Sequence, residues 1–299
     1  MTNDRQIPVI LDCDNTFGVP GCDVDDGLAL LYLLGCPEVR VLGITCTYGN
    51  NTLDTVYRNT IRLLDEWGRR DIPVLKGAPS CADRSGEAAA FLAASAAQYA
   101  GELRVIATGA TTNLLGAQEI DRSFFKHVHT FSLMGGLTEP LYVGGHPMDE
   151  LNLSCDPAAS LSVLQQGSRV MVATAQNCLR SFFPRAECLA ILEESDRPIA
   201  RYLASHLTYW FDLNETNWDL SGIVNWDVMA AAQLVHPEYF EMNRQIISPS
   251  LVSLKTGRLT GDGDALSIFL PRITDQSAYV RHIYSTYLSA QVDLRKNNI

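Results

Sequence analysis

Through most of the chain, short apolar runs alternate with longer segments of helical pattern, and this alternation limits the folds that the chain can adopt. Strands are expected at residues 7–11, 39–45, 72–75, 104–108, 128–134 and 170–173, and helices between them at 25–34, 54–67, 88–99, 113–120 and 158–164. Strands that are apolar almost throughout are buried on both faces, which is typical of parallel sheets. The sequence therefore predicts an α/β fold: a mostly parallel central sheet with helices on both faces.

After about Pro184 the pattern becomes rich in helices. Helices are expected at residues 186–207 and 228–235, strand-like pieces near 246–254, and a last helix around 278–294. We find no Ser/Gly/Pro-rich linker, charge block or internal repeat that would separate two units. The sequence predicts a single domain over residues 1–299, with a helical C-terminal elaboration.

Composition narrows the classes of function and location. With 46% hydrophobic and 19% charged residues, the chain has an ordinary globular composition. Its net charge of −11 argues against a nucleic-acid partner, which would need a basic face. No apolar stretch reaches the roughly 18 residues of a membrane span, and residues 1–6 do not resemble a signal peptide. The eight cysteines include no C-x-x-C pair, so we expect free thiols in the cytoplasm, and neither a nucleic-acid nor a membrane partner.

The loop that links the first expected strand to the first expected helix is strongly acidic. It carries five carboxylates within 15 residues, and no Lys or Arg lies among them: Asp12, Asp14, Asp23, Asp25 and Asp26. Carboxylates at this density repel one another unless a cation lies between them. The loop also leaves the carboxyl end of a strand, where open α/β sheets place their sites. We therefore interpret it as a metal site.

Other segments are expected at the same edge of the sheet. Each lies where a loop leaves a strand or enters a helix, and each offers oxygen donors or a close approach of the backbone: residues 48–50, 108–113, 134–136, 149–152 and 225–227. Because the carboxyl ends of parallel strands share one edge, these segments are candidates for the walls of the site.

The motifs in these segments resemble, in order, the signature of the inosine–uridine preferring nucleoside hydrolases. They are D-x-D at 12–14, P-G at 20–21, D-D at 25–26, G-N at 49–50, T-N at 112–113, M-G-G at 134–136, E-x-N at 150–152 and W-D at 226–227. The matches span about residues 7–236, and the ordered set is more specific than any single motif. The resemblance implies a Rossmann-like nucleoside hydrolase fold and an N-glycosyl hydrolase that splits ribonucleosides into free base and ribose, in nucleoside catabolism or salvage.

The resemblance also assigns roles to residues. It implies that Ca²⁺ is held by Asp14, Asp26, the backbone carbonyl of Thr112 and Asp227, and hard oxygen donors of this kind suit that ion. Asp14 would be the general base for a water molecule that the ion acidifies. The sugar would be bound by Asp25, Asn50, Glu150 and Asn152 and would pack against Met134. Relatives form homodimers or homotetramers, so the resemblance implies a homo-oligomer whose other partner is a small nucleoside.

Three positions depart from the family pattern. Residues 15–24 lengthen the first loop, so that either Asp23 or Asp25 can take the sugar-binding place. Trp226 stands where many members carry a histidine, and an indole cannot donate a proton at neutral pH. We expect its ring either to stack on the base, preferably a purine, or to pack in the core. Gly144 occupies the usual place of a sugar-binding asparagine, with His146 nearby as a candidate substitute.

Two other readings remain open. The D-x-D-x-T pattern at 12–16 also fits a haloacid-dehalogenase-type Mg²⁺ phosphatase with Asp12 as nucleophile, but the lysine and acidic pair that it needs have only one closely spaced candidate, Lys255 with Asp262 and Asp264. A non-catalytic nucleoside- or ribose-binding protein could keep the metal and sugar contacts and lose the leaving-group chemistry. Release of ribose from nucleosides distinguishes the three.

Overall fold

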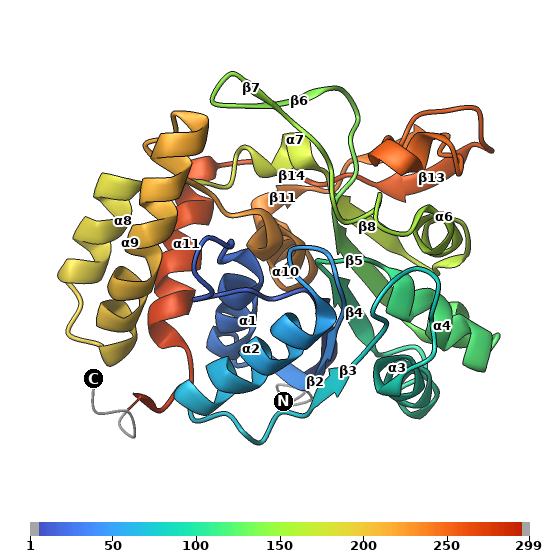
Figure 1. Ribbon diagram of the computed structural model, residues 1–299, viewed down its shortest axis with the longest axis horizontal. Coiled ribbons are helices and arrows are strands. Elements are labelled where there is room, and N and C mark those ends of the chain that lie inside the picture. The colour runs from blue at the N-terminus through green and yellow to red at the C-terminus, as the bar shows by residue number, and fades with distance from the viewer. Residues whose placement is uncertain (1–5, 295–299) are drawn as a thin grey trace.

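An eight-stranded sheet forms the centre of the protein, whose computed structural model describes residues 6–294 (Figure 1). The strands in spatial order are β12 (Arg244–Ile247), β13 (Leu266–Phe269), β8 (Val170–Ala173), β5 (Thr130–Met134), β4 (Arg104–Ala107), β1 (Ile7–Cys13), β2 (Val39–Cys46) and β3 (Val74–Lys76). All neighbours pair in parallel except β12 and β13. The predicted mostly parallel sheet is confirmed. Residues 1–5, on which the expectation about a signal peptide rests, lie outside the described residues.

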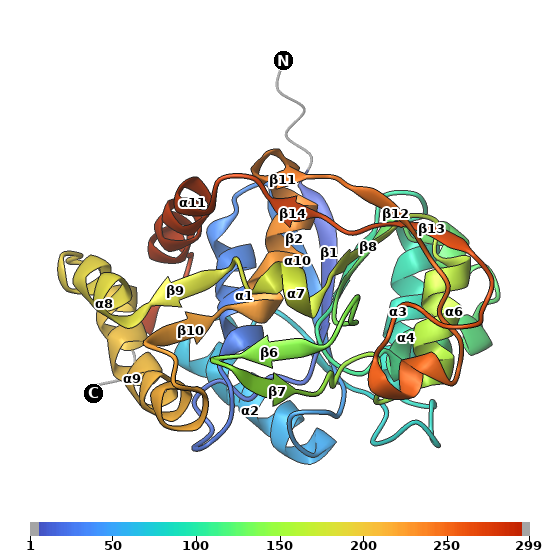
Figure 2. The ribbon, with the colours of Figure 1, turned by 90° about the horizontal axis from the view of Figure 1, so that it is seen from above.

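Helices cover both faces of this sheet, as predicted. On one side lie α1 (Asp25–Gly35), α2 (Leu53–Glu66), α10 (Trp226–Val235) and α11 (Gln276–Ser289), and on the other α3 (Glu87–Gln98), α4 (Thr112–Ile120), α5 (Phe124–His127) and α6 (Pro157–Gln166). Figure 2 shows α11 and the α3–α4–α6 group on opposite sides of the sheet. Side chains of β1 alternate between the two cores, with Leu11 in one and Ile10 in the other. Burial of both faces explains why the strands are apolar throughout.

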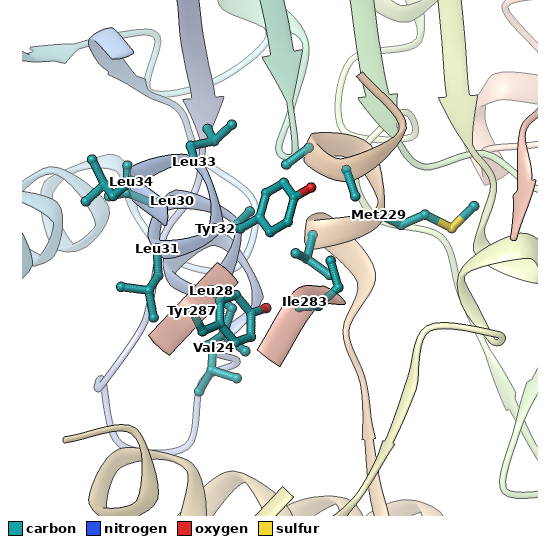
Figure 3. Close-up of a cluster of buried hydrophobic side chains, with 14 of the residues drawn as sticks. Val24, Leu28, Leu30, Leu31, Tyr32, Leu33, Leu34, Met229, Ile283 and Tyr287 are labelled. Carbon is teal, nitrogen blue, oxygen red and sulfur yellow. The ribbon is translucent and has the colours of Figure 1, made fainter. Parts of the chain in front are cut away.

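Helix α1 is buried along almost its whole length. Every residue from Asp25 to Leu34 is buried, because α1 packs against α10 and α11 as well as β2. Figure 3 shows Tyr32 between α1 and α10, and Ile283 and Tyr287 of α11 beside the same helix. Truncating a side chain such as Leu28 to alanine in such a core costs about 2–5 kcal/mol. The first turn of α1 is therefore held in a fixed place.

The C-terminal part is rich in helices, as predicted, but its boundaries differ. The single helix expected at 186–207 is two helices, α8 (Arg185–Glu193) and α9 (Pro198–Trp218). Pro198 begins α9 and keeps Arg197 extended, at φ −71° and ψ 136°, so the helix cannot run through. Strand β12 ends at Ile247 and a 3₁₀ turn follows at Ser253–Thr256, whereas we expected strand-like structure to 254. Helix α11 ends at Ser289 rather than near 294.

Small two-stranded sheets complete the structure, and the sequence did not indicate them. They are β6 (Leu141–Val143) with β7 (His146–Met148), β9 (Phe182–Pro184) with β10 (Gly222–Val224), and β11 (Phe240–Glu241) with β14 (Arg272–Ile273); a short helix α7 (Ala175–Cys178) and a 3₁₀ turn at Pro237–Tyr239 accompany them. The β6–β7 hairpin projects from the body of the molecule (Figure 1). Within residues 6–294, no helix has both the length and the apolar character needed to cross a bilayer.

Candidate active site

The topology of the sheet places a crevice at the carboxyl end of β1. This strand pairs with β2 on one side and β4 on the other, so the chain connections run in opposite directions from this point. Open α/β sheets bind ligands at such a switch point. A cavity of about 270 Å³ lies there, walled by residues from the β1–α1 loop, the ends of β4 and β5, the β6–β7 hairpin, α9 and α10: Asp23, Asp25, Asn50, Thr108, Met134, Gly135, Leu141, Val143, Met148, Asp149, Glu150, Leu151, Asn152, Ala175, Trp210, Asn214, Trp218, Trp226 and Asp227.

Three carboxylates from distant parts of the chain meet behind the wall of this cavity, which Asp227 lines and Asp14 and Asp26 do not. Asp26 lies within hydrogen-bonding reach of both Asp14 and Asp227. Asp14 follows β1, Asp26 is in the first turn of α1, and Asp227 is in the first turn of α10. All three are buried, with exposures of 0%, 1% and 4%. The packing of α1 on α10 thus brings together side chains that are separated by some two hundred residues of sequence.

The backbone is shaped around Asp14. The N–H of Asn50 donates to Oδ2 of Asp14 at 2.6 Å, and the Asn50 side chain donates to Oδ1 at 3.4 Å. A Cβ atom at Gly49, whose φ is +154°, would lie 2.1 Å from Oδ2 of Asp14, and one at Gly109 would lie 3.0 Å from Oδ1. Both glycines are therefore required where the β2–α2 and β4–α4 loops approach this carboxylate. Asp14 is held from two loops, and its neighbour Asn50 lines the cavity.

Asp25 and Asp26 each keep one carboxylate oxygen free. Oδ1 of Asp26 accepts a hydrogen bond from the Thr108 hydroxyl at 2.6 Å, and Oδ2 of Asp25 accepts from the backbone N–H of Trp226 at 3.4 Å. The remaining oxygens, Oδ2 of Asp26 and Oδ1 of Asp25, are buried and receive no hydrogen bond from any described residue. Buried acceptors in native proteins are normally satisfied, so these two oxygens indicate a place for a positively charged ligand.

Burial and mutual repulsion dominate the electrostatics of the cluster. Burial raises the pKa of Asp26 to about 8, and the charge of Asp23 adds to this rise. For Asp14 and Asp227, burial is again the main cause that raises the pKa well above its ordinary value, with repulsion by Asp26 next. The helix N-termini at Asp26 and Asp227 favour negative charge by only about 0.3–1 kcal/mol each. A divalent cation would neutralise the cluster, and its all-oxygen donors suit a hard ion.

Thr112, the fourth predicted ligand, is the first residue of α4. Its side chain is bonded to residues outside the Asp14–Asp26–Asp227 cluster. The hydroxyl donates to Oδ2 of Asp156 at 3.1 Å and also contacts the Tyr48 hydroxyl. Thr112 is buried and does not line the cavity. The role of its backbone carbonyl stays a prediction. Thr108, which the sequence offered only as part of a strand-to-helix loop, contacts Asp26 directly and lines the cavity.

The four residues predicted for the sugar outside the first loop all line the cavity: Asn50, Met134, Glu150 and Asn152. Glu150 is also a structural centre, because its carboxylate accepts hydrogen bonds from the backbone N–H groups of Gly136, Leu153 and Ser154 at 3.1, 2.7 and 2.9 Å. Burial nevertheless raises its pKa. A carboxylate has about four acceptor positions, so Glu150 can still accept a bond from a hydroxyl.

The longer first loop, residues 15–24, is anchored to the body of the protein by Phe17. The Phe17 ring is fully buried and stacks on Tyr202 of α9, with centroids 6.2 Å apart. Its carbonyl accepts a hydrogen bond from Arg62 at 2.8 Å. The returning arm of the loop brings both Asp23 and Asp25 to the cavity wall, so the structure leaves both as candidates for the sugar.

Three tryptophans also contribute to the cavity wall. Trp226 opens α10, while Trp210 and Trp218 come from α9, and all three line the cavity beside Leu141 and Val143 of the β6–β7 hairpin. The sequence could not identify Asn214 as a wall residue, because its position depends on how α9 packs. Gly144 leaves no room for a larger side chain, since a Cβ would lie 1.5 Å from the Trp218 carbonyl oxygen. His146 contacts Asp219, 3.2 Å away, and does not line the cavity.

The arrangement does not fit the phosphatase reading. Asp12, its nucleophile, is fully buried within β1. Oδ1 of Asp12 accepts hydrogen bonds from Thr45 at 2.6 Å and from Asn113 at 2.8 Å, which ties β1 to β2 and α4. Lys255 is an exposed residue of a 3₁₀ turn, so it does not provide the buried cationic partner that this chemistry needs.

The chain is similar in sequence to known nucleoside hydrolases. The sequence model of the family "Inosine-uridine preferring nucleoside hydrolase" matches residues 9–264. The chain is 25% identical to "Probable uridine nucleosidase 2" of Oryza sativa subsp. japonica, over 87% of this chain and 85% of the relative. It is 27% identical to "Pyrimidine-specific ribonucleoside hydrolase RihA" of Salmonella typhi, over 78% and 81%.

Solved structures show the same fold. A plant nucleoside hydrolase, PpNRh1, superposes with a TM-score of 0.82 at 21% identity, covering 94% of this chain and 98% of that one. A purine-preferring ribonucleoside hydrolase from Gardnerella vaginalis superposes with a TM-score of 0.78 at 21% identity, covering 95% and 99%.

Proposed function

The chain belongs to the inosine–uridine preferring nucleoside hydrolase family and is an N-glycosyl hydrolase of ribonucleosides, and from this premise we propose that Asp14, Asp26 and Asp227 hold a Ca²⁺ ion at its active site. One observation carries the proposal: Asp26 lies beside both other carboxylates, while its Oδ2 is buried without a donor among the described residues. The Thr112 carbonyl is the proposed fourth protein ligand. When bound, the ion would supply positive charge for the carboxylates, coordinate sugar hydroxyls and lower the pKa of a water molecule.

Asp14 is the proposed general base. Its carboxylate is fixed by Asn50 and enclosed by Gly49 and Gly109, so its direction relative to the cavity is set before the substrate binds. Asp14 accepts a proton from the attacking water, whose oxygen bonds to the anomeric carbon while the C–N bond breaks and its electron pair leaves with the base. The sugar passes through an oxocarbenium-like state, which the surrounding carboxylates stabilise.

The ribose is proposed to lie between the acidic loop and the end of β5. Asp25, Asn50, Glu150 and Asn152 supply polar groups to this part of the cavity, with Asp23 as the alternative to Asp25. Asn152 is oriented toward Met134, because its amide donates to the Met134 carbonyl at 3.2 Å. We propose that Met134 packs against the sugar and excludes water from the reacting carbon.

The base is proposed to bind against the tryptophans. Trp226 stands at the start of α10, one residue before Asp227, so the aromatic ring and the metal ligand come from the same helical turn. Stacking on such a ring holds the leaving base in place without donating a proton. Protonation of the base is left to solvent.

Incubation with inosine, uridine and adenosine, followed by a reducing-sugar assay, tests the proposed function. We expect ribose from at least one nucleoside, and loss of that activity after treatment with a chelator that Ca²⁺ restores. Binding of a nucleoside without any product would support the nucleoside-binding protein instead. We also expect a homodimer or homotetramer in the cytoplasm, which light scattering on the purified protein and fractionation of cells can check.

A further inference from the structure

A second group of metal-ligating side chains lies at the other ends of α1 and α10. The thiol of Cys36, a carboxylate oxygen of Glu38 and a ring nitrogen of His236 lie within 4.8 Å of one another. Cys36 caps the C-terminus of α1, Glu38 precedes β2, and His236 caps the C-terminus of α10. An 11-residue helix is about 16 Å long, so this cluster is separate from the carboxylates at the N-terminus of α1.

His236 is oriented as metal-binding histidines are. Its Nδ1 lies 2.8 Å from Oε1 of Glu238, and its Nε2 lies 2.9 Å from Oε1 of Glu38. A carboxylate that accepts the Nδ1 proton fixes the tautomer and presents the Nε2 lone pair to a metal. A doubly protonated imidazole between two glutamates satisfies the same contacts, and the buried Cys36 thiol also lies within hydrogen-bonding reach of Tyr32. What points to a metal is that this thiol lies within 4.8 Å of both the Glu38 oxygen and the His236 nitrogen.

The position at two helix ends is also compatible with a cation. The C-terminus of a helix carries partial negative charge, which favours a positive charge beside it. Helices α1 and α10 both end at this cluster, and their last turns, like those of most described helices, contain no basic residue. A metal ion bound to Cys36 and His236 would supply positive charge to both helix ends together.

We propose that Cys36, Glu38 and His236 bind a Zn²⁺ ion, with Glu238 orienting His236. One sulfur, one imidazole nitrogen and one carboxylate oxygen are ligands that zinc takes in proteins, and three protein ligands leave one position for water. Cys36 binds as the thiolate, so binding releases its proton. The ion clamps the C-terminal ends of the two helices whose first turns carry Asp26 and Asp227. The proposal does not depend on the proposed function.

Titration with Co²⁺ tests this site, because cobalt bound to a thiolate gives a sulfur-to-metal charge-transfer band that oxygen ligands do not give. The chelator-treated full-length protein should develop this band with one equivalent of Co²⁺, and Zn²⁺ should abolish it by competition. Cobalt at the carboxylate cluster would not produce the band, so the two sites are distinguished spectroscopically.

Variants make the assignment specific. Cys36→Ser should remove the band, and Glu38→Gln and Glu238→Gln should each weaken Co²⁺ binding about 10- to 100-fold. Cys81→Ser and Glu193→Gln are matched controls, since both residues are exposed and outside the cluster, and they should bind as the wild type does. Glu38 is partly exposed, with 39% of its side chain accessible, so its variant should fold even if Cys36→Ser does not. A wild-type protein without the band, or a band that persists in Cys36→Ser or is unchanged in Glu38→Gln, would overturn the proposal.

Discussion

Asp14 combines complete burial with close backbone contacts on two sides. Its neighbours are Asn50, which donates two hydrogen bonds, the glycines at 49 and 109, and the carboxylate of Asp26. Burial and the charge of Asp26 raise its pKa well above the ordinary value, so the side chain is a poor base unless a cation restores its ionised form. At the scale of the residue, chemistry and metal binding are therefore coupled.

Replacement of Asp14 by asparagine separates catalysis from folding. Asp14→Asn should lower kcat on nucleosides about 10²- to 10⁴-fold, the usual contribution of a general base. Because one buried charge is removed, the melting temperature in the presence of a chelator should be at least that of the wild type. Initial rates and a thermal melt check both parts, and near-normal turnover would place the base elsewhere.

Trp226 offers a test of base stacking. Trp226→Ala should lower kcat/KM for inosine and adenosine more than for uridine, since a larger ring loses more stacking; the loss for purines should be about 5- to 10-fold, from stacking worth about 1 kcal/mol. Trp67→Ala is not a suitable control, because Trp67 is buried in the hydrophobic core and its loss would destabilise the fold. Trp210→Phe keeps an aromatic ring in the cavity wall and should lower kcat/KM less than Trp226→Ala does. Equal losses for purines and pyrimidines in Trp226→Ala would indicate a packing role alone.

The residues of the site lie at the ends of helices and strands. Helices α1 and α10 begin at the cavity, β1 and β4 end there, and the turn after β2 brings Gly49 and Asn50 to Asp14. The ends of apolar strands and the starts of helices are visible in the sequence, so Asp14, Asp26 and Asp227 could be assigned to one edge of the sheet from the sequence alone. The walls from α9 and the β6–β7 hairpin could not, because they depend on how distant segments pack.

The same limit applies to the fold. Runs such as 170–173 gave β8 with its observed bounds, since a strand apolar on both faces has a strong signal. Strands of three residues, as in β6, β7, β9 and β10, are too short to show a period. The break between α8 and α9 is marked only by Pro198, and the helical pattern on both sides of this proline predicts one continuous helix.

The close approach of the turn after β2 to Asp14 can be tested by adding one methyl group at Gly49. Gly49→Ala would place a Cβ 2.1 Å from Oδ2 of Asp14, so we expect turnover to fall at least tenfold and Ca²⁺ affinity to fall with it. Gly101→Ala is the matched control: its φ is +76°, but a Cβ there meets nothing within 4 Å. The control should lose about 1 kcal/mol of stability or less and keep full activity. Equal activity in both variants would contradict the close fit around Asp14.

At the scale of the whole molecule, the acidic centre should make stability depend on pH and on metal. Burial raises the pKa of Asp23 to about 6, of Asp12 to about 7 and of Asp26 to about 8, from an ordinary 3.8. Groups with a raised pKa bind protons in the folded state that the unfolded chain has released. Their contribution to stability is complete below about pH 4 and is lost as the pH rises to about 8.

The melting temperature of the chelator-treated protein should therefore fall between pH 5 and pH 8, by about 2–4 °C for each kcal/mol of lost stability. Saturating Ca²⁺ should reduce this slope, because the carboxylates are then ionised in the folded protein as well. A thermal melt series with and without Ca²⁺ measures both slopes. A chelator-treated protein that becomes more stable over this range would show that the cluster is ionised without a cation.

A crystal structure of the Ca²⁺-loaded protein shows whether carboxylates from three distant segments share one divalent cation. We expect a single ion beside the cavity, with oxygens of Asp14, Asp26 and Asp227 about 2.3–2.6 Å away. Two results would contradict the shared site. One is an ion bound elsewhere, with no ion among these carboxylates; the other is an ion that contacts Asp14 and Asp26 but has Asp227 outside its coordination sphere.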